Sequence, residues 1–353
     1  MKRSSSIKAL FLDAPGKLRF GTFHETNEKA DETADSSNKL RLRVQAVTVC
    51  GSDLHYYKEG AIGSSVALEP HILGHEFSAI VDEDRGEAFG LPRGTLVAVD
   101  PNEACGRCEW CARGETNLCP NVKFAGSAPI HGALREVYRA KPEALFKVPA
   151  ALDATDAAML EPLGVAIHAL DLAKVRLGSS VAIVGAGAIG LLILQLVRVV
   201  GAGEIHVLEP LGYRRELALK LGADSVHETA ESLVKHTRGR GVDSVLEATD
   251  TPEGPGAACA VARIGGKVVL VGIPDGDVFT LSASQIRRKG LTIKLSRRMG
   301  DVYPRAIQLV AQNRIDIKAI ATHHFAFANA PEAFALQTNR RDNVIKSVIH
   351  LED

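Results

Sequence analysis

The sequence lacks an excess of charge of either sign. Lysine plus arginine and aspartate plus glutamate each number 42, so the formal net charge is zero. Nucleic-acid-binding proteins usually carry a basic excess, so the overall charge does not support that class, although the balance could conceal a local basic patch. Charged residues at 24% and hydrophobic residues at 46% are ordinary for a soluble globular protein.

Long hydrophobic runs, internal repeats and low-complexity tracts are also missing. No apolar run reaches the roughly 18 residues that a membrane-spanning helix needs. Residues 1–16 start with basic side chains, but Asp13 and Pro15 break their short apolar stretch, so we predict a strand there rather than a signal peptide. A chain of 353 residues can form two domains with real cores. We expect a reduced, cytoplasmic protein.

Cysteine is scarce and unevenly placed. Of six cysteines, four lie within fifteen positions, in the array C-x2-C-x2-C-x7-C formed by Cys105, Cys108, Cys111 and Cys119. Three disulfides would require an oxidising compartment, which nothing in the sequence indicates. Four thiolates satisfy tetrahedral zinc, so the array predicts a zinc site. Taken alone, it could belong to many classes of protein, nucleic-acid binders included.

The chain changes character near residue 154. Before it, short segments punctuated by Gly and Pro predict a β-rich fold, with strands at 7–12 and 40–49. The polar, non-periodic stretch 24–38 predicts an exposed loop. Beyond it, strands alternate with helices, which is typical of a doubly wound parallel sheet. We expect strands at 180–184, 205–208, 242–246 and 267–271, and helices at 188–200 and 213–221.

The last portion of the chain, from residue 295, predicts a helix near 304–312, a shorter helix after Pro331 and a terminal strand near 344–351.

A G-x-G-x-x-G motif, made by Gly185, Gly187 and Gly190, follows the first strand of the alternating region and opens a helix. A second strand ends in Glu209, nineteen residues beyond Gly190, and this is the context that a dinucleotide site requires. The glycines permit a tight turn, close approach of the pyrophosphate and close packing of helix on strand. The helix N-terminus offers N–H groups to the phosphates.

Glu209 is placed to accept hydrogen bonds from the adenosine ribose, and its charge would repel a 2′-phosphate. We therefore expect NAD in preference to NADP. Arg214 and Arg215 weaken this expectation because arginine accommodates the extra phosphate. A glycine-rich turn that binds nothing and an adenosyl-methionine site are the alternatives.

A second candidate metal site is scattered through the chain. Cys50 lies in VCGSDLH at a predicted strand end, His75 and Glu76 lie on a predicted loop, and Glu161 precedes Pro162, which we expect to hold it at the entry to a helix. Thiolate, imidazole and carboxylate ligands with one open position are typical of catalytic zinc. Taken singly, these residue types are more often a buried thiol, a core histidine and solvated carboxylates.

The order Cys-Gly-Ser-Asp, Gly-His-Glu, four-cysteine array, Glu-Pro and G-x-G-x-x-G resembles the zinc-dependent medium-chain dehydrogenases/reductases over nearly the whole chain. CGSDLHYYKEGAIG and LEPLGVAIHA resemble the polyol branch, which contains sorbitol (L-iditol), xylitol and L-idonate 5-dehydrogenases. The resemblance implies a GroES-like β-rich catalytic domain (1–155 and 295–353) with a structural zinc lobe (101–120). It also implies a Rossmann NAD-binding domain (156–294).

The resemblance also implies residue roles. Two zinc ions per subunit are expected, one in the four-cysteine lobe and one held by Cys50, His75 and Glu76. Glu161 would bind the zinc directly or through water, and the zinc would polarise the substrate alcohol. Ser52 would receive the substrate proton and His55 could pass it towards solvent, although His55 could equally be an ordinary loop histidine. Asp53 would orient the ligand histidine.

Further expectations concern substrate and cofactor. The substrate pocket of polyol dehydrogenases corresponds to Tyr56, Phe124, Ser127, Arg298 and Met299. Met299 replaces a tyrosine that is common in sorbitol dehydrogenase, which puts sorbitol itself in doubt. Arg297 beside Arg298 would suit an acidic substrate such as idonate. The nucleotide would also contact Ile189, Arg214, Val271, Gly272, Ile273 and Arg297. Cys259 matches no role and is expected to be a buried thiol.

The function expected from this resemblance is oxidation of a secondary alcohol of a polyol or sugar acid to the ketone, with hydride transfer to NAD. Threonine, butanediol or an amino-cyclitol are the alternative substrates. A non-catalytic nucleotide sensor would have no need to keep all four candidate ligands, and a zinc-ribbon nucleic-acid binder fits neither the neutral charge nor the glycine motif. Family members are usually dimers or tetramers, and by analogy we expect a homotetramer that binds neither nucleic acid nor membrane.

Overall fold

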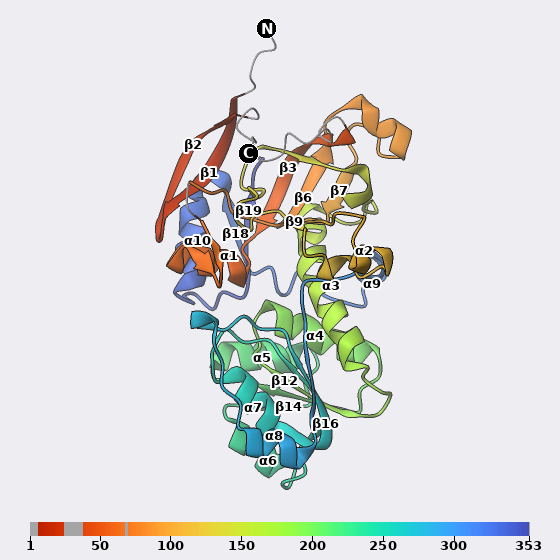
Figure 1. Ribbon diagram of the computed structural model, residues 1–353, viewed down its shortest axis with the longest axis vertical. Helices are drawn as coiled ribbons and strands as arrows, with labels where there is room; N and C mark the ends of the chain where they lie inside the picture. Colours follow the sequence, from red (N-terminus) through yellow and green to blue (C-terminus); the bar gives the residue numbers. More distant parts are fainter. Residues whose placement is uncertain (1–5, 25–37, 68–69, 353) are drawn as a thin grey trace. The chain divides into compact units, whose positions relative to one another are not determined.

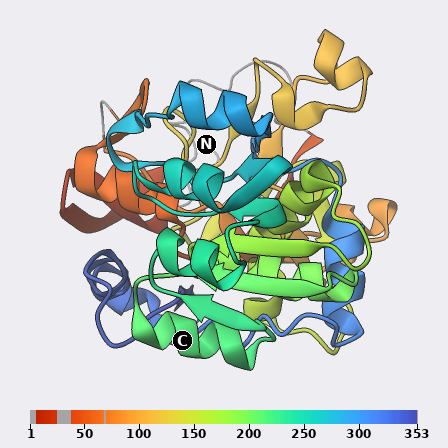
Figure 2. The same cartoon turned by 90° about the horizontal axis from the view of Figure 1, so that it is seen from below.

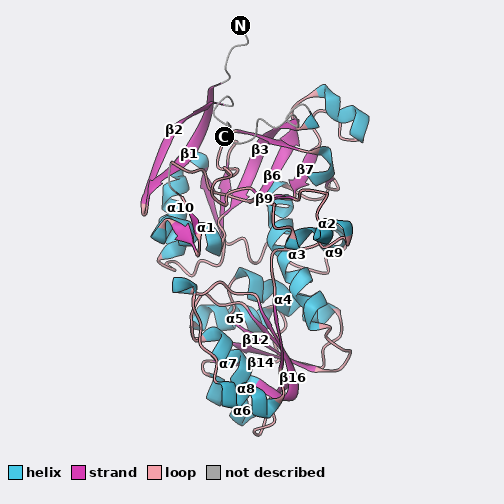
Figure 3. Cartoon of the chain, viewed as in Figure 1, coloured by secondary structure: helices cyan, strands magenta, loops and turns pink. Residues whose placement is uncertain are grey.

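The computed structural model describes residues 6–24, 38–67 and 70–352. The chain divides into two compact units, one formed by Met1–Glu161 with Ala321–Asp353 and the other by Pro162–Ile320. Strands dominate the first unit, whereas strands and helices alternate in the second (Figure 3). The predicted loop at 24–38 falls, apart from its two ends, outside the described residues.

This division differs from the predicted domain limits of 155/156 and 294/295. Residues 295–320 pack with the second unit. Asp316 shows why, because its backbone N–H donates to the side-chain oxygen of Gln195 (2.7 Å) and its carbonyl accepts from the side-chain nitrogen of Gln195 (3.1 Å).

The first unit is built on a seven-stranded sheet. β3, β6 and β7 lie side by side in it (Figure 1). The strand pairs are antiparallel except β18–β19. Along the sheet the order is β11 (Leu145–Lys147), β7 (Leu96–Val99), β6 (Glu76–Val81), β3 (Leu40–Thr48), β19 (Ser347–His350) and β18 (His323–Ala326), with β10 (Val137–Ala140) also pairing with β3.

Among the described residues, this unit also contains three two-stranded pairs, three α-helices and the start of α3 (Ala154–Ala173). The pairs are β1 (Ser6–Ala14) with β2 (Lys17–His24), β4 (Ala61–Ile62) with β5 (Ser65–Val66), and β8 (Asn102–Glu103) with β9 (Lys123–Phe124). The helices are α1 (Gly51–Glu59), α2 (Glu109–Ala112) and α10 (Ala330–Thr338). The core between them includes Leu42, Val44, Phe77 and Phe334. The strands predicted at 7–12 and 40–49 are confirmed as β1 and β3.

The second unit is a six-stranded sheet in which every pair is parallel. In chain order its strands are arranged 3-2-1-4-5-6, the Rossmann arrangement. They run β14 (Ser225–His227), β13 (Glu204–Leu208), β12 (Ser180–Val184), β15 (Val242–Glu247), β16 (Ala262–Leu270) and β17 (Thr292–Leu295). Helices lie on both faces of this sheet (Figure 2).

The helices of this unit are α4 (Ala188–Val199), α5 (Gly212–Lys220), α6 (Ala230–His236), α7 (Gly254–Val261), α8 (Ala283–Lys289) and α9 (Tyr303–Ala311). Strands covered on both faces read as continuous apolar runs, as in SVAIV of β12. The predicted alternation of strands and helices is therefore confirmed. None of the described helices combines the length and hydrophobicity required to cross a bilayer.

One helix, α3 (Ala154–Ala173), corrects a sequence-based expectation. Pro162 was expected to open a helix, but it lies inside α3, and Glu161 therefore lies in the helix interior. A proline in a helix loses one backbone hydrogen bond. The helix continues because residues on both sides of Pro162 are buried, among them Met159, Leu160 and Leu163. Burial of these side chains outweighs the local preference of proline.

Candidate functional site

Cys50 lies between β3 and α1, where it is the residue that caps the N-terminus of the helix. Its backbone N–H donates to Oδ2 of Asp53 at 3.0 Å, so the first turn of α1 fixes the position of the thiol. Gly60, with φ 74°, ends the same helix in the left-handed conformation that favours glycine.

His75 and Glu76 lie where the chain enters the central sheet. Glu76 is the first residue of β6 and pairs with Thr48 of β3, so it belongs to a strand and not to the predicted loop. Gly74 before them has φ 92°, and an added Cβ would lie 2.8 Å from a methyl carbon of Val47. The backbone at this point therefore requires glycine.

Asp53 joins these two segments. Its Oδ1 accepts the backbone N–H of Gly74 at 3.1 Å and lies 3.4 Å from Nδ1 of His75. Burial disfavours the charged form of both side chains, but their mutual attraction lowers the pKa of Asp53 and raises that of His75 well above its usual value. Nδ1 of His75 thus faces Asp53. Nε2 of the same ring faces Ser52, whose hydroxyl lies 3.4 Å away.

Cys50, His75 and Glu76 each offer a ligand atom, and the three atoms lie within 4.8 Å of one another. Ligands on one tetrahedral zinc ion lie about 3.3–3.8 Å apart, given bonds of roughly 2.0–2.3 Å. His75 and Glu76 are buried and Cys50 is partly exposed. The donor set of sulfur, nitrogen and oxygen fits zinc, and Asp53 supplies the partner that a ligand histidine usually has on its other nitrogen.

Glu76 has partners that the sequence did not reveal. Lys346 lies 2.7 Å from Oε1 and 2.5 Å from Oε2, and the hydroxyl of Thr48 also donates to Oε2. All three side chains are fully or almost fully buried. A carboxylate has about four lone-pair positions, so these contacts leave room for a metal ion. The only local signal for Lys346 was a lysine within the apolar terminal strand pattern.

Glu161 is not a member of the three-residue cluster but interacts electrostatically with it. Burial raises the pKa of its carboxyl to about 8; His75 opposes this shift and Glu76 adds to it. Without an ion, burial therefore favours the protonated form of Glu161. A nearby cation favours the carboxylate form.

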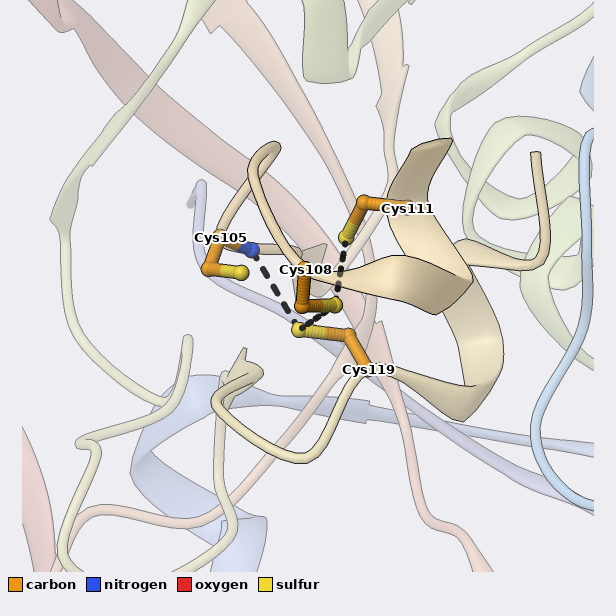
Figure 4. A group of neighbouring side chains, drawn as sticks. All are labelled: Cys105, Cys108, Cys111 and Cys119. Carbon is orange, nitrogen blue, oxygen red and sulfur yellow. Dashed lines mark hydrogen bonds between the residues drawn. The ribbon is translucent and has the colours of Figure 1, made fainter. Parts of the chain in front are cut away.

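The four-cysteine array forms a compact cluster around α2 and the following 3-10 turn Thr116–Leu118. The four side chains point towards one another (Figure 4). Sγ of Cys108 lies 3.4 Å from Sγ of Cys111 and 3.8 Å from Sγ of Cys119. Zinc–sulfur bonds of roughly 2.3 Å predict sulfur–sulfur distances of about 3.8 Å, so the cluster fits a zinc ion. All six cysteines of the chain are free thiols.

The glycine motif forms the expected turn between β12 and α4. Gly185 has φ 94°, and an added Cβ at Gly190 would lie 1.9 Å from the carbonyl oxygen of Gly185, so both positions exclude larger residues. At Gly187, the N-cap of α4, the space is open and the nearest atom to an added Cβ is 3.9 Å away on Arg214. The helix N-terminus is thus accessible to a phosphate group.

Glu209 braces this turn. Its carboxylate accepts the backbone N–H of Ala186 at 2.8 Å and that of Leu211 at 3.0 Å, and only 3% of the residue is exposed. Arg214 lies 3.8 Å from the same carboxylate. The guanidinium of Arg215 instead donates to the carbonyls of Glu209 and Pro210. Of the two arginines, only Arg214 therefore faces the carboxylate of Glu209, beside which the 2′-phosphate of NADP would bind.

The structure also locates the remaining predicted residues of the first unit. His55 is in α1 and buried rather than on a loop. The hydroxyl of Tyr56 contacts those of Ser65 (2.5 Å) and Ser127 (3.3 Å), and Tyr56 is fully buried. The ring of Phe124 lies 5.3 Å from that of His75.

Other predicted residues belong to the second unit. Met299 is buried, and an added Cβ at Gly164 would lie 2.4 Å from its sulfur, so Met299 packs against α3. Arg298 has φ 54°. Cys259 is a buried thiol, as expected. Four more are fully or partly accessible: Ile189, Val271, Ile273 and Arg297. An added Cβ at Gly272 would lie 1.9 Å from the carbonyl oxygen of Thr249.

Both units match known sequence families. Residues 36–150 match the alcohol dehydrogenase GroES-like domain, and residues 188–312 match the zinc-binding dehydrogenases. The chain is 33% identical over 347 residues to sorbitol dehydrogenase from Bacillus subtilis (strain 168), covering 95% of this chain and 98% of that protein. It is 32% identical over 353 residues to D-xylulose reductase from Saccharomyces cerevisiae, covering 97% of each.

A solved structure agrees with these matches. A putative zinc-binding dehydrogenase from Sinorhizobium meliloti 1021, bound to NADP, is 29% identical and superposes with a TM-score of 0.85. That similarity covers 98% of this chain and 100% of the other. The Rossmann unit and the β-rich unit with its ligand clusters thus define an oxidoreductase of the zinc-binding type. The chain belongs to the zinc-dependent medium-chain alcohol dehydrogenase family.

Proposed function

We propose that this enzyme oxidises a secondary alcohol of a polyol or sugar acid to the corresponding ketone and transfers the hydride to NAD. The observation that carries the proposal is the cluster of Cys50, His75 and Glu76, whose ligand atoms lie within 4.8 Å of one another beside the hydroxyl of Ser52. Similarity to proteins named sorbitol dehydrogenase and D-xylulose reductase supports a polyol as the substrate class.

In this proposal Cys50, His75 and Glu76 hold the catalytic zinc, and Glu161 completes the site directly or through a water. Zinc bound there supplies Lewis acidity to the alcohol oxygen. Asp53 fixes the ring of His75 through Nδ1 and so keeps Nε2 available as the ligand. The hydroxyl of Ser52 accepts the substrate proton as it releases its own. The buried His55 is one route by which that proton could leave.

The predicted second zinc is structural and bound by Cys105, Cys108, Cys111 and Cys119. NAD is the proposed hydride acceptor, with the pyrophosphate at the N-terminus of α4. The charge of Glu209 supports NAD, whereas Arg214 and the NADP-bound relative support NADP. We place NAD first because like charges in close contact are costly. Tyr56, Phe124, Ser127, Arg298 and Met299 stay predictions for the substrate pocket, as do the tetramer and the cytoplasmic location.

The proposal is tested by following reduction of NAD, and separately of NADP, with sorbitol, xylitol, L-idonate, galactitol, threonine and butanediol. We expect activity on one or more of the polyols or on idonate, and a higher kcat/KM with NAD than with NADP. Activity on threonine or butanediol alone would instead assign the alternative function.

The first prediction concerns the metal ligand. Cys50→Ala should lower kcat/KM at least about 1,000-fold, because Lewis-acid catalysis contributes several kcal/mol to the barrier. The matched control is Cys259→Ala, which removes a buried thiol that lies outside both ligand clusters. Metal analysis should find one zinc ion per chain fewer in Cys50→Ala than in the wild type. Full turnover by Cys50→Ala would refute the metal mechanism.

A further inference from the structure

Three histidines from separate elements of the second unit come together at one edge of its sheet. They are His206 of β13, His227 of β14 and His236 in the last turn of α6. Each offers one ring nitrogen, and these nitrogens lie within 4.8 Å of one another. The centroids of the three rings are 5.1–6.1 Å apart. Neither the dinucleotide turn nor the two predicted zinc sites includes any of the three.

The parallel register explains how the rings meet. His206 pairs with Ser225 and Leu208 pairs with His227. Side chains two apart on a strand share a face, so His206, Ser225 and His227 lie on the same face of the sheet. α6 contacts both β13 and β14, which brings His236 to the other two rings.

The hydroxyl of Ser225 orders the two buried rings. It lies 2.8 Å from Nδ1 of His206 and 2.8 Å from Nε2 of His227. Nδ1 of His227 lies 3.1 Å from the hydroxyl of Ser232. A hydroxyl oxygen has two lone pairs and can accept N–H groups from both rings. That arrangement leaves Nε2 of His206 and Nδ1 of His227 unprotonated, which is the form that binds a metal ion. A metal ion on Nδ1 of His227 would replace the hydrogen bond from Ser232.

Nε2 of His206 is a buried polar atom without a hydrogen-bond partner among the described residues. Only 2% of His206 is exposed, so bulk solvent does not reach this atom. Such atoms are rare in folded proteins and destabilise them unless an ion or water completes the site. Oε2 of Glu204 lies 3.6 Å from this atom. That distance is too long for a hydrogen bond but close to the roughly 3.4 Å between nitrogen and oxygen ligands of one tetrahedral zinc.

The electrostatic environment agrees with this geometry. Burial and the neighbouring His236 lower the pKa of His206, and burial and the same ring lower that of His227. Burial thus favours the uncharged form of both rings. His236 is exposed at the end of α6, so its ring can turn to shorten the ligand distances at little cost. Imidazole nitrogens with a carboxylate suit zinc and other divalent first-row metals.

We propose that His206, His227 and His236 form a third metal site, for zinc or a similar divalent transition metal, with Glu204 or water as the fourth ligand. Ser225 positions His206 and His227 for this role. The ion would tie α6 to β13 and β14 and so stabilise the edge of the Rossmann unit. It would take no part in hydride transfer, and the proposal is independent of the substrate.

The test uses the whole enzyme, purified and then dialysed against metal-free buffer after addition of excess zinc. The wild type should retain one more zinc per chain than His236→Gln. Zinc at a hundredfold excess over its dissociation constant should raise the midpoint of thermal unfolding by about 5 °C in the wild type and not in His236→Gln. His236 is exposed, so its replacement should not prevent folding.

The matched control is Lys235→Gln, which changes the adjacent exposed residue of α6 and leaves all three rings in place. It should retain the third zinc. Cobalt exchanged for zinc at the histidine cluster alone, with zinc left in the two cysteine-containing sites, should give ligand-field bands without thiolate-to-cobalt charge transfer, because the cluster contains no sulfur. Equal zinc content in the wild type and His236→Gln, loss of the third zinc on dialysis, or a charge-transfer band would each overturn the proposal.

Discussion

Lys346 is a buried cation whose charge is balanced by the carboxylate of Glu76. Only 3% of the residue is exposed, and its ammonium group contacts both carboxylate oxygens of Glu76. Burial disfavours its charged form, but Glu76 and Cys50 raise the pKa of Lys346 above its usual value. The side chain therefore remains charged and compensates a carboxylate that is just as deeply buried.

Removal of this charge should be costly. Lys346→Met leaves Glu76 buried without its counter-ion, and we expect the free energy of unfolding of the metal-free protein to fall by about 3–5 kcal/mol. Denaturant unfolding after chelation measures the change. Lys346→Arg keeps the charge and should recover most of the stability. Equal stability of the Met variant and the wild type would show that the pair contributes nothing.

His131 gives the protein a defined response to acid. Burial, with the nearby His71 and Arg135, lowers the pKa of His131 from 6.5 to about 4. Its Nδ1 accepts the backbone N–H of Ile72 at 3.2 Å, which requires a neutral ring. Because the folded pKa is lowered, the unfolded chain binds more protons than the folded chain between these values. His131 therefore contributes stability above pH 6.5 that is lost as the pH falls towards 4.

The change in the pKa of His131 from 6.5 to about 4 sets the size of the lost stability. The free energy of unfolding should fall by about 3 kcal/mol between pH 6.5 and 4. His131→Asn retains an acceptor for the N–H of Ile72 but cannot titrate. Its free energy of unfolding should fall by about 3 kcal/mol less than that of the wild type over the same interval. Parallel pH profiles for the two proteins, measured by denaturant unfolding, would contradict the assignment.

Several site residues could be predicted one by one because short motifs carry their chemistry. The four cysteines and the three glycines of the turn lie close together in sequence, and their spacing alone indicates what they can bind. Thr48 and Lys346 could not be found in this way. Thr48 is an unremarkable strand residue, and Lys346 reaches Glu76 across a separation of 270 positions.

At the level of secondary-structure elements, Asp243 ties three strands of the parallel sheet together. One carboxylate oxygen accepts from the backbone N–H (2.9 Å) and hydroxyl (2.8 Å) of Ser180 in β12. The other accepts from Arg240 (2.9 Å) and from Arg263 of β16 (2.5 Å). Burial opposes ionisation, but the donors, Arg263 first, hold the pKa of Asp243 well below its usual range.

Asp243→Asn should lower the free energy of unfolding by about 2–3 kcal/mol, because hydrogen bonds to a charged group are lost at a shared junction. Asp171→Asn is the matched control. Asp171 also accepts two bonds from one arginine, Arg305, but both side chains are about half exposed. An exposed pair contributes at most about 1 kcal/mol. Similar losses in the two variants would show that the junction has no special role.

Element boundaries were predictable where the apolar pattern is strong. β12 has the limits that the run at 180–184 predicts, and α4 ends one residue before the predicted limit. α3 shows where such prediction fails. A prediction from the local sequence places a helix boundary at Pro162. In the structure the helix continues past the proline because the residues on both sides of it are buried. Local propensity is weak compared with the burial of a whole helical turn.

At the scale of the whole molecule, the four-cysteine lobe is expected to stabilise the first unit without forming part of the dinucleotide site. Cys119→Ser removes the one fully buried ligand of the cluster. We expect loss of one zinc per chain and a decrease of about 4 kcal/mol or more in the free energy of unfolding. Binding of NADH, followed by its fluorescence at a temperature where the variant is folded, should persist because the glycine turn lies in the other unit.

Cys259→Ala is the control for loss of a buried cysteine and should keep both zinc ions. If Cys119→Ser retained wild-type stability, the lobe would have no structural role. If it lost nucleotide binding while still folded, the two units would depend on each other more closely than proposed.

The sequence by itself determined the types of element, their order and the two local motifs. Hydrophobic periodicity and glycine positions depend on near neighbours in the chain, so they can be seen without a structure. The family resemblance added the candidate ligands Cys50, His75 and Glu76.

Only the tertiary structure decided which distant groups meet. The register of β3 against β6 and β19 places Thr48 beside Glu76 and brings the end of the chain to the same point. The register of β13 against β14 and the return of α6 assemble His206, His227 and His236. Contacts of this kind depend on strand pairing over long separations, and a shift of one residue would turn each side chain to the opposite face. No local pattern records them, which is why the third cluster of ligands appears only in the folded chain.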